Sequence, residues 1–274
     1  MEAIVLIVCG LLAGALGALV GLGGGIIIVP ALIYLGSYTP LLKPISPQVA
    51  VGTSLLIMIF TGLSSTLSYM KHKTVDYKSG WIFFLGSGPG AIVGAWVNQT
   101  LKMSTFNVYF GSFMIFVALL LMFKNRLKPV QGLFNQTIKR TFMDGEGHTY
   151  EYGYHPLMGI LISFIVGFCS GIFGIGGGSL MVPAMMLIFL FPPHVAIATS
   201  MFMIFLSALV SSTMHIWLGN VNWTYALFLI PGAWIGAKVG AWMNTKLKSD
   251  TLVSILRIIL ILIGLRLIYQ GIVG

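Results

Sequence analysis

The chain has 274 residues, of which 57% are hydrophobic and only 8% are charged, and its formal net charge is +9. Soluble domains carry about 25% charged residues, so this chain has too few to cover a water-facing surface and is expected in lipid. The positive charge does not indicate a nucleic-acid partner, because the basic residues lie in short loops between apolar segments, where they set membrane orientation.

In chain order, eight apolar segments are long enough, or nearly so, to cross a hydrocarbon core about 30 Å thick. The first is expected to be retained, because Met1 and Glu2 supply no basic start and the segment runs into glycines rather than into a cleavage site. Cys9 and Cys169 lie at non-equivalent positions, so neither a disulfide nor a thiolate metal site is expected. The eight segments are residues 3–20, 48–70, 81–97, 106–123, 157–173, 195–218, 224–244 and 251–271.

The two halves of the chain repeat one pattern, which predicts a duplication. The repeats are residues 1–123 and 156–274, and the alignment leaves one additional helical turn, 238–241, in the second. A polar linker, 124–155, joins them; we interpret it as a solvated connector, with a regulatory or partner-binding role as the alternative. The matching segments are 14–31 with 167–184, 47–54 with 193–200, and 89–95 with 231–237.

The glycine-rich stretch in each repeat, which ends in Val-Pro, decides how the repeats are oriented. If the chain turns at the glycines, the returning segment of the first repeat, about residues 25–36, is roughly 18 Å long as a helix. That length is too short to span the membrane. Each repeat is then a broken or re-entrant helical hairpin followed by three transmembrane helices, and the two repeats are inverted.

The positions of Lys and Arg favour the inverted arrangement. Ten basic residues then share one side of the membrane, and only Lys43 and Lys102 remain on the other. Four simple spans per repeat would give eight against four, a weaker bias. The predicted fold is an all-α polytopic protein of the cell (inner) membrane, with a cytoplasmic linker and both termini outside. The ten residues are Lys71, Lys73, Lys78, Lys124, Arg126, Lys128, Lys139, Arg140, Lys246 and Lys248.

The glycine-rich stretches are also the first candidates for binding a ligand. A backbone without side chains turns sharply, and the helix that follows presents free N–H groups at the positive end of its dipole. Two such ends in an inverted-repeat protein can face one site near the membrane midplane, where an anion is the natural ligand. Close helix packing is the alternative. The candidates are Gly23, Gly24, Gly25, Gly176, Gly177 and Gly178.

A stripe of hydroxyl side chains, repeated in both halves, supplies the second group of candidates. Hydroxyls bind a solute without the cost of a buried charge, and the Thr-Ser pairs are the best of them. The alternative is hydrogen bonding between helices or to the carbonyl one turn back. Gln48 and His194 stand at equivalent positions beside the pairs, as oxyanion ligands or as helix-start residues. The stripe comprises Thr53, Ser54, Thr61, Ser65 and Thr66 and their counterparts Thr199, Ser200, Ser207, Ser211 and Ser212.

Ionisable groups inside membrane spans are costly and therefore informative. Lys238, Arg257 and Arg266 are the cationic candidates, with packing or snorkelling to the interface as the alternative. No Asp or Glu lies deep in a predicted span, so a relay of buried carboxylates is not supported. No hydrolytic, metalloprotease or Walker pattern occurs, so we expect neither an enzyme nor a cofactor, and ATP-driven transport would need another chain.

The paired motifs Gly-Leu/Ile-Gly-Gly-Gly-x3-Val-Pro and Pro-Gly-Ala-x2-Gly-Ala resemble those of the sulfite exporter TauE/SafE family of membrane permeases. The resemblance covers nearly the whole chain except the linker, whose length departs from the family pattern. It implies transport of small sulfur-containing anions, such as sulfite, thiosulfate, sulfoacetate or other organosulfonates. The residues by themselves indicate only a small anion.

The expected function is therefore secondary transport of such an anion by alternating access, in which the halves rock around a central site. An anion channel of the same fold and a non-transporting membrane scaffold are the alternatives. The expected partners are the small anion, the lipid bilayer and a coupling ion, either a proton or sodium, and a homodimer is compatible with the sequence.

Overall fold

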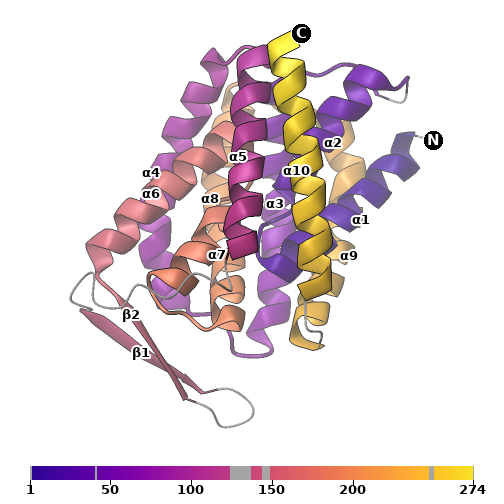
Figure 1. Cartoon of the computed structure of the whole chain (residues 1–274). Helices are drawn as coiled ribbons and strands as arrows, with labels where there is room; N and C mark the ends of the chain where they lie inside the picture. The colour runs from indigo at the N-terminus through magenta and orange to yellow at the C-terminus, as the bar shows by residue number, and fades with distance from the viewer. Residues whose placement is uncertain (1, 41, 124–136, 144–148, 247–249, 274) are drawn as a thin grey trace.

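The computed structural model describes residues 2–40, 42–123, 137–143, 149–246 and 250–273. This part of the chain forms ten α-helices and one antiparallel β-hairpin (Figure 1). The first half contains α1 (Glu2–Val20), α2 (Gly25–Tyr38), α3 (Pro47–Met70), α4 (Tyr77–Thr100) and α5 (Met103–Phe123). The linker contributes β1 (Ile138–Met143) and β2 (Thr149–Tyr154). The second half contains α6 (Pro156–Phe173), α7 (Gly178–Leu187), α8 (Pro193–Trp217), α9 (Trp223–Lys246) and α10 (Asp250–Val273).

Two of the ten helices are half-length. Helix α2 has 14 residues and α7 has 10, whereas a membrane span needs about 20. The other eight described helices are long and apolar enough to cross a membrane. Each half therefore has a full helix, a short returning helix and three further full helices. This confirms the predicted all-α polytopic fold with a broken hairpin at the start of each repeat.

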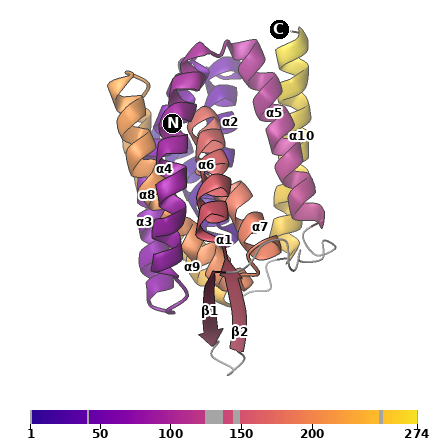
Figure 2. The ribbon, with the colours of Figure 1, turned by 90° about the vertical axis from the view of Figure 1, so that its left-hand side faces the viewer.

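The two halves run in opposite directions. Helix α1 starts at the N-terminus, toward the upper side of Figure 1, and runs down, whereas α6 starts beside β2 at the lower end and runs up. The view turned by 90° shows the same opposition, with the hairpin projecting below the bundle and the C-terminus above it (Figure 2). Both termini thus lie away from the hairpin, as the inverted arrangement predicts.

The halves interlock through glycine-lined contacts between α1 and α9 and between α4 and α6. Small residues let the backbones approach closely, so a Cβ atom added at any of these glycines would clash with a carbonyl of the facing helix. In α4, Gly86, Gly90 and Gly94 face the carbonyls of Ile160, Phe164 and Phe168. In α9, Gly232, Gly236 and Gly240 face the carbonyls of Ile7, Leu11 and Ala15.

These contacts correct one detail of the sequence alignment. Gly86 occupies the place of Gly232, an offset of 146 residues, whereas the paired segments 89–95 and 231–237 differ by 142. Helices α4 and α9 each have 24 residues, so the additional turn predicted at 238–241 does not exist. Glycines recur every four residues in both helices, and a slip of one turn therefore aligns small residues again.

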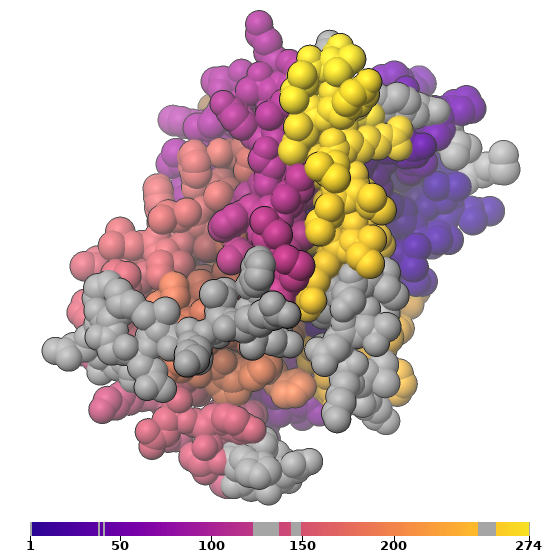
Figure 3. Space-filling view, in the orientation of Figure 1, coloured from indigo at the N-terminus to yellow at the C-terminus, as the bar shows by residue number. Residues whose placement is uncertain are grey.

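The outer surface of the bundle is apolar. Helices α5 and α10 lie side by side and cover one face in the space-filling view (Figure 3). Five tryptophans project from the helix surface with more than half of their area exposed, as expected at a membrane–water interface. Exposed apolar surface of this extent fits lipid better than water. The tryptophans are Trp81, Trp96, Trp217, Trp223 and Trp242.

The described part of the linker, 137–143 and 149–155, is partly buried, whereas the sequence predicts a solvated connector. Strands β1 and β2 pair from Ile138 opposite Tyr154 to Met143 opposite Thr149. Tyr152 and Tyr154 are buried, and they pack against aromatic side chains of α4 and of the α7–α8 connection. The hairpin is therefore docked on the membrane bundle, at the end where the α3–α4 connection lies.

Candidate functional site

Both glycine-rich stretches adopt a backbone that glycine alone adopts readily. Three glycines in each have φ between +68° and +89°, in the left-handed region. Gly24 and Gly177 are the residues directly before α2 and α7, and neither helix start has a side-chain cap. The repeated spacing in the sequence thus encodes a sharp turn that ends in a helix N-terminus. The left-handed glycines are Gly21, Gly23 and Gly24 and their counterparts Gly174, Gly176 and Gly177.

The two turns meet one another inside the protein. A Cβ atom added at Gly25 would clash with the carbonyl of Gly174, and one added at Gly178 would clash with the carbonyl of Gly21. All residues of both turns are buried. Met58 of α3 and Ile204 of α8 pack against this contact. We call this region the junction: it is the place where turn residues 21–25 and 174–178 meet, together with Met58 of α3 and Ile204 of α8.

Ser54 and Ser200 each bind the turn of the opposite half. The hydroxyl of Ser54 donates to the carbonyl oxygen of Gly174 at 2.9 Å, and that of Ser200 donates to Gly21 at 3.0 Å. Both side chains are fully buried. Both hydroxyl protons are therefore used for bonds within the protein in this conformation, and the two bonds to the turns occupy equivalent places in the repeat. The Ser200 hydroxyl also lies 2.8 Å from the carbonyl oxygen of Ile197 in its own helix.

Thr53 and Thr199 bind the start of a long helix instead of the glycines. The backbone N–H of Asn222, before α9, donates to Thr53 Oγ1 at 2.9 Å. The N–H of Asp76, before α4, donates to Thr199 Oγ1 at 3.0 Å. Each Thr-Ser pair therefore joins a glycine turn to the beginning of a helix.

Gln48 and His194 lie at the ends of α4 and α9. Gln48 Nε2 donates to the carbonyl oxygens of Asn98 at 3.0 Å and Leu101 at 2.8 Å. His194 Nδ1 lies 3.4 Å from Asn244 Oδ1. Gln48 and His194 are the second residues of α3 and α8, and these contacts join the start of each helix to the end of α4 or α9.

The other hydroxyls of the stripe fall into three groups, according to the hydrogen-bond partner of each. Thr61 reaches the junction, because its hydroxyl donates to the carbonyl of Gly23 at 3.0 Å. Ser65 and Ser207 donate to carbonyls one turn back in their own helices, at 2.7 Å and 2.8 Å. The hydroxyls of Thr66, Ser211 and Ser212 are buried and have no hydrogen-bond partner among the described residues.

The in-span cations lie away from the junction. Lys238 is exposed on the outer face of α9. The guanidinium carbon of Arg266 lies 4.3 Å from the centre of the Tyr34 ring, beside a largely apolar pocket of about 300 Å³ between α2 and α10. Arg257 is half-buried in α10. None of the three supplies a charge to the glycine turns.

Two further pairs of equivalent polar residues, which were not predicted from the sequence, lie near the turns and the helix starts. Asn98 and Asn244 are buried, and their amides donate at 2.7 Å to the carbonyls of Ile172 and Leu19, just before each glycine turn. Asp76 and Asn222 are the helix starts that the threonines bind. Both pairs are 146 residues apart, so extending the repeat at that offset would have found them.

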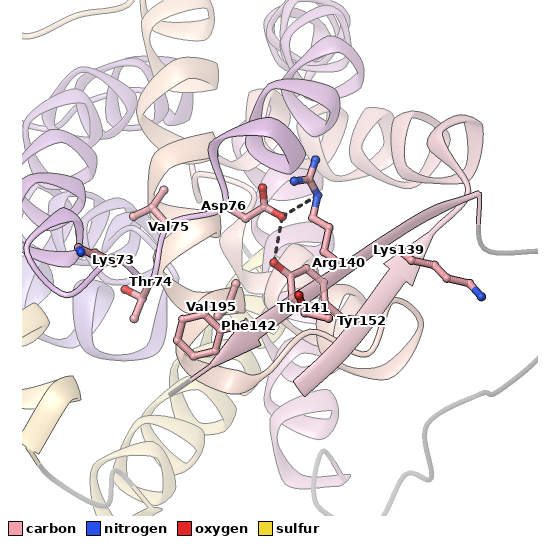
Figure 4. Close-up of a pocket in the computed structure, with 10 residues that line it drawn as sticks. All are labelled: Lys73, Thr74, Val75, Asp76, Lys139, Arg140, Thr141, Phe142, Tyr152 and Val195. Atoms are coloured by element: carbon pink, nitrogen blue, oxygen red, sulfur yellow. Dashed lines mark hydrogen bonds and ion pairs between the residues drawn. The ribbon is translucent and has the colours of Figure 1, made fainter. Parts of the chain in front are cut away.

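The carboxylate of Asp76 also binds side chains of the hairpin (Figure 4). Its carboxylate accepts hydrogen bonds from Ser79 N at 3.1 Å, Ser79 Oγ at 2.6 Å and the Tyr152 hydroxyl at 3.1 Å. Arg140 Nε lies 3.2 Å from the same carboxylate, and the Asp76 side chain is only 8% exposed. Burial, reinforced by the Asp76 charge, raises the pKa of Tyr152, so this phenol stays a proton donor.

These groups form one wall of a polar pocket of about 430 Å³ between the hairpin and the α3–α4 connection. Figure 4 shows Arg140 and Tyr152 pointing toward Asp76, whereas Lys139 points away. The pocket is separate from the junction, but a short path joins the two: Asp76 binds Thr199, and the adjacent Ser200 binds Gly21.

Comparison with known proteins places this architecture in a family. The protein "Probable membrane transporter protein YunE" of Bacillus subtilis is 57% identical over 99% of both chains. YjnA of the same organism, also a "Probable membrane transporter protein", is 28% identical over 96% of this chain and 98% of its own. The "Sulfite exporter TauE/SafE family protein 6" of Arabidopsis thaliana is 31% identical over 56% of this chain and 32% of its own. The model of the sulfite exporter TauE/SafE family matches residues 6–267, and the chain belongs to this family.

Proposed function

We propose that this protein is a secondary transporter that moves a small sulfur-containing anion across the cell membrane by alternating access. The main support for this proposal is the junction, where the half-helices α2 and α7 of the inverted repeats begin at glycine turns that contact each other. The names of YunE and YjnA support membrane transport, and eight membrane-length helices support a multi-pass protein.

An anion is the ligand that the junction favours. Helices α2 and α7 begin there without a side-chain cap and without an acidic residue in the first turn. The first N–H groups of a helix lack partners inside it, and they lie at the positive end of the helix dipole. A small oxyanion is attracted to both features, so backbone groups can bind it without a buried cation.

Alternating access follows from the inverted repeats and from the bonds across the junction. Ser54 and Ser200 make equivalent bonds to the opposite half, so the two halves can exchange roles between an outward-open and an inward-open state. Each bond contributes only about 1 kcal/mol, which a bound ligand can replace. Met58 and Ile204 fill the space against the turns in the present, closed conformation.

The sulfur chemistry of the substrate rests on the family. Sulfite is part of the name of the family and of the Arabidopsis relative, and sulfite, thiosulfate, sulfoacetate and other organosulfonates share a compact anionic head. The ten-to-two charge asymmetry supports a cytoplasmic hairpin with both termini outside.

Counterflow in proteoliposomes tests the proposal. Labelled thiosulfate or sulfite is added outside vesicles that contain either no anion or an excess of the same unlabelled anion. A transporter that works by alternating access takes up label faster when unlabelled anion is inside. Equal uptake in both vesicles indicates a channel, and no uptake of either thiosulfate or sulfite contradicts transport of this class.

A further inference from the structure

The two glycine turns match closely, but the half-helices that follow them differ at the second residue. Gly24 and Gly25 correspond to Gly177 and Gly178. The next residue is Ile26 in α2 and Ser179 in α7. Ser179 is thus a polar residue at the start of α7 for which the start of α2 has only an apolar counterpart.

The hydroxyl of Ser179 is fully buried and has no hydrogen-bond partner among the described residues. By contrast, the hydroxyls of Ser54, Thr61 and Ser200 all bind backbone carbonyls of the turns. Buried polar groups in proteins are nearly always paired, so an unpaired hydroxyl calls for a partner that is absent from the protein itself.

Ser179 is the second residue of α7 and directly follows Gly178 of the junction. Cα–Cβ bonds in a helix tilt toward its N-terminus, so the second residue of α7 leans over the first turn. That turn starts at Gly178, which touches the carbonyl of Gly21 in the opposite half. The remaining unpaired hydroxyls (Thr66, Ser87, Ser211 and Ser212) lie in the interior of long helices instead.

We propose that Ser179 donates a hydrogen bond from its hydroxyl to the transported anion, together with its own backbone N–H at the start of α7, so that the α7 side of the junction binds the anionic head. The inference rests on the proposed function, because it assumes that the anion binds at the junction. The site is then asymmetric although the turns are symmetric. Ile26 presents methyl groups from the α2 side, where the organic part of a sulfonate would lie.

Binding to the purified full-length protein tests this assignment, with sulfoacetate and thiosulfate as the probes. The informative variant is Ser179→Ala, and Ser87→Ala is its matched control, because the Ser87 hydroxyl is also buried and unpaired among the described residues but lies in the interior of α4. A hydrogen bond to a charged group contributes a factor of roughly 10 to 100 in affinity, so Ser179→Ala should raise Kd by that factor. Ser87→Ala should leave the Kd for thiosulfate within about twofold, since its hydroxyl lies in α4 and not at the start of α7.

The melting temperature without ligand separates ligand binding from a structural role. Removing an unpaired buried hydroxyl should leave the ligand-free protein as stable as the wild type, or more stable. An unchanged Kd for Ser179→Ala, with wild-type binding and counterflow intact, overturns the assignment but not the proposed function. A lowered ligand-free melting temperature also overturns it, because the hydroxyl would then have a structural partner. If the wild type itself neither binds nor transports these anions, the proposed function fails first.

Discussion

At the hairpin end of the molecule, Asp76 begins α4 and binds Thr199; at the opposite end, Asn222 begins α9 and binds Thr53. The backbone bonds are the same, but the side chains differ in charge. Asp76 accepts additional bonds from Tyr152 and Arg140 of the hairpin, whereas the side chain of Asn222 caps α9 at Tyr225 N.

The hairpin is therefore an addition to the duplicated bundle, and its described residues contact the end where α4 begins. Opening the hairpin end would break the bonds of Tyr152 and Arg140 to Asp76, and the bond from Gly153 N to the Phe189 carbonyl. Opening the other end requires none of these. In the proposed transport cycle, these hairpin contacts would favour the state in which the hairpin end is closed, whereas the equivalent glycine turns would favour neither state.

The largest expected effect comes from the glycine turns, where the halves should respond alike. Gly25→Ala and Gly178→Ala each place a Cβ atom against a backbone carbonyl of the opposite turn. Each variant should lower the free energy of unfolding by about 3 kcal/mol, because the backbone at the junction has to shift. Denaturation in detergent measures this.

Gly219→Ala is the control for that experiment. Gly219 has φ of +74°, but a Cβ atom there meets nothing within 4 Å. Only backbone strain remains, so the loss should be about 1 kcal/mol. If the variants at the turns are no less stable than this control, the close contact of the two turns is wrong.

The second prediction addresses the unlike ends directly. Asn222→Ala removes a helix cap and should cost about 1 kcal/mol in unfolding free energy. Asp76→Ala removes a cap and also leaves Tyr152 and Arg140 without their partner, so it should cost about 3 kcal/mol. Equal losses would mean that the hairpin adds nothing to that end.

Arg140→Gln isolates the charged part of this contact. The Arg140 side chain is 25% exposed, so its ion pair with Asp76 is partly screened and should contribute under about 1 kcal/mol. The contribution should shrink further in high salt.

A similarly small effect is expected at the serines that cross the junction. Ser54→Ala and Ser200→Ala each remove one neutral hydrogen bond, so each should lower the free energy of unfolding by about 1 kcal/mol. The two losses should agree within about 0.5 kcal/mol, since the bonds are equivalent. A large difference between them would show that the halves are not energetically equivalent at the junction.

Much of the fold could be predicted from local pattern. The apolar runs marked the long helices, and the return at the glycines predicted a short helix near residues 25–36, which the structure extends to Gly25–Tyr38. Glycine spacing predicts such a turn because only glycine tolerates the left-handed backbone at Gly21, Gly23 and Gly24. The inversion followed from the same turn.

The sequence could not show which partners these residues bind. Ser54 bonds Gly174 across 120 positions, and no periodicity reports so distant a contact. The register of α4 against α9 was missed by one turn, because regularly spaced glycines align equally well after a slip of four residues. Asp76 was overlooked because it lies in a connection, where its carboxylate could be expected to face water rather than the buried side of a hairpin.

The interlocking of the halves has a consequence for biosynthesis. Helix α1 is synthesised before the second repeat, yet its glycines Gly10 and Gly14 pack against α9 of that repeat. Helix α4 likewise packs against α6, which is synthesised after it. When only the first repeat has entered the membrane, the small-residue faces of α1 and α4 therefore lie against lipid, because the helices that pack on them are not yet made. Assembly completes only when the second repeat enters the membrane in the opposite direction, so a chain truncated after the first repeat should be a substrate for membrane proteases.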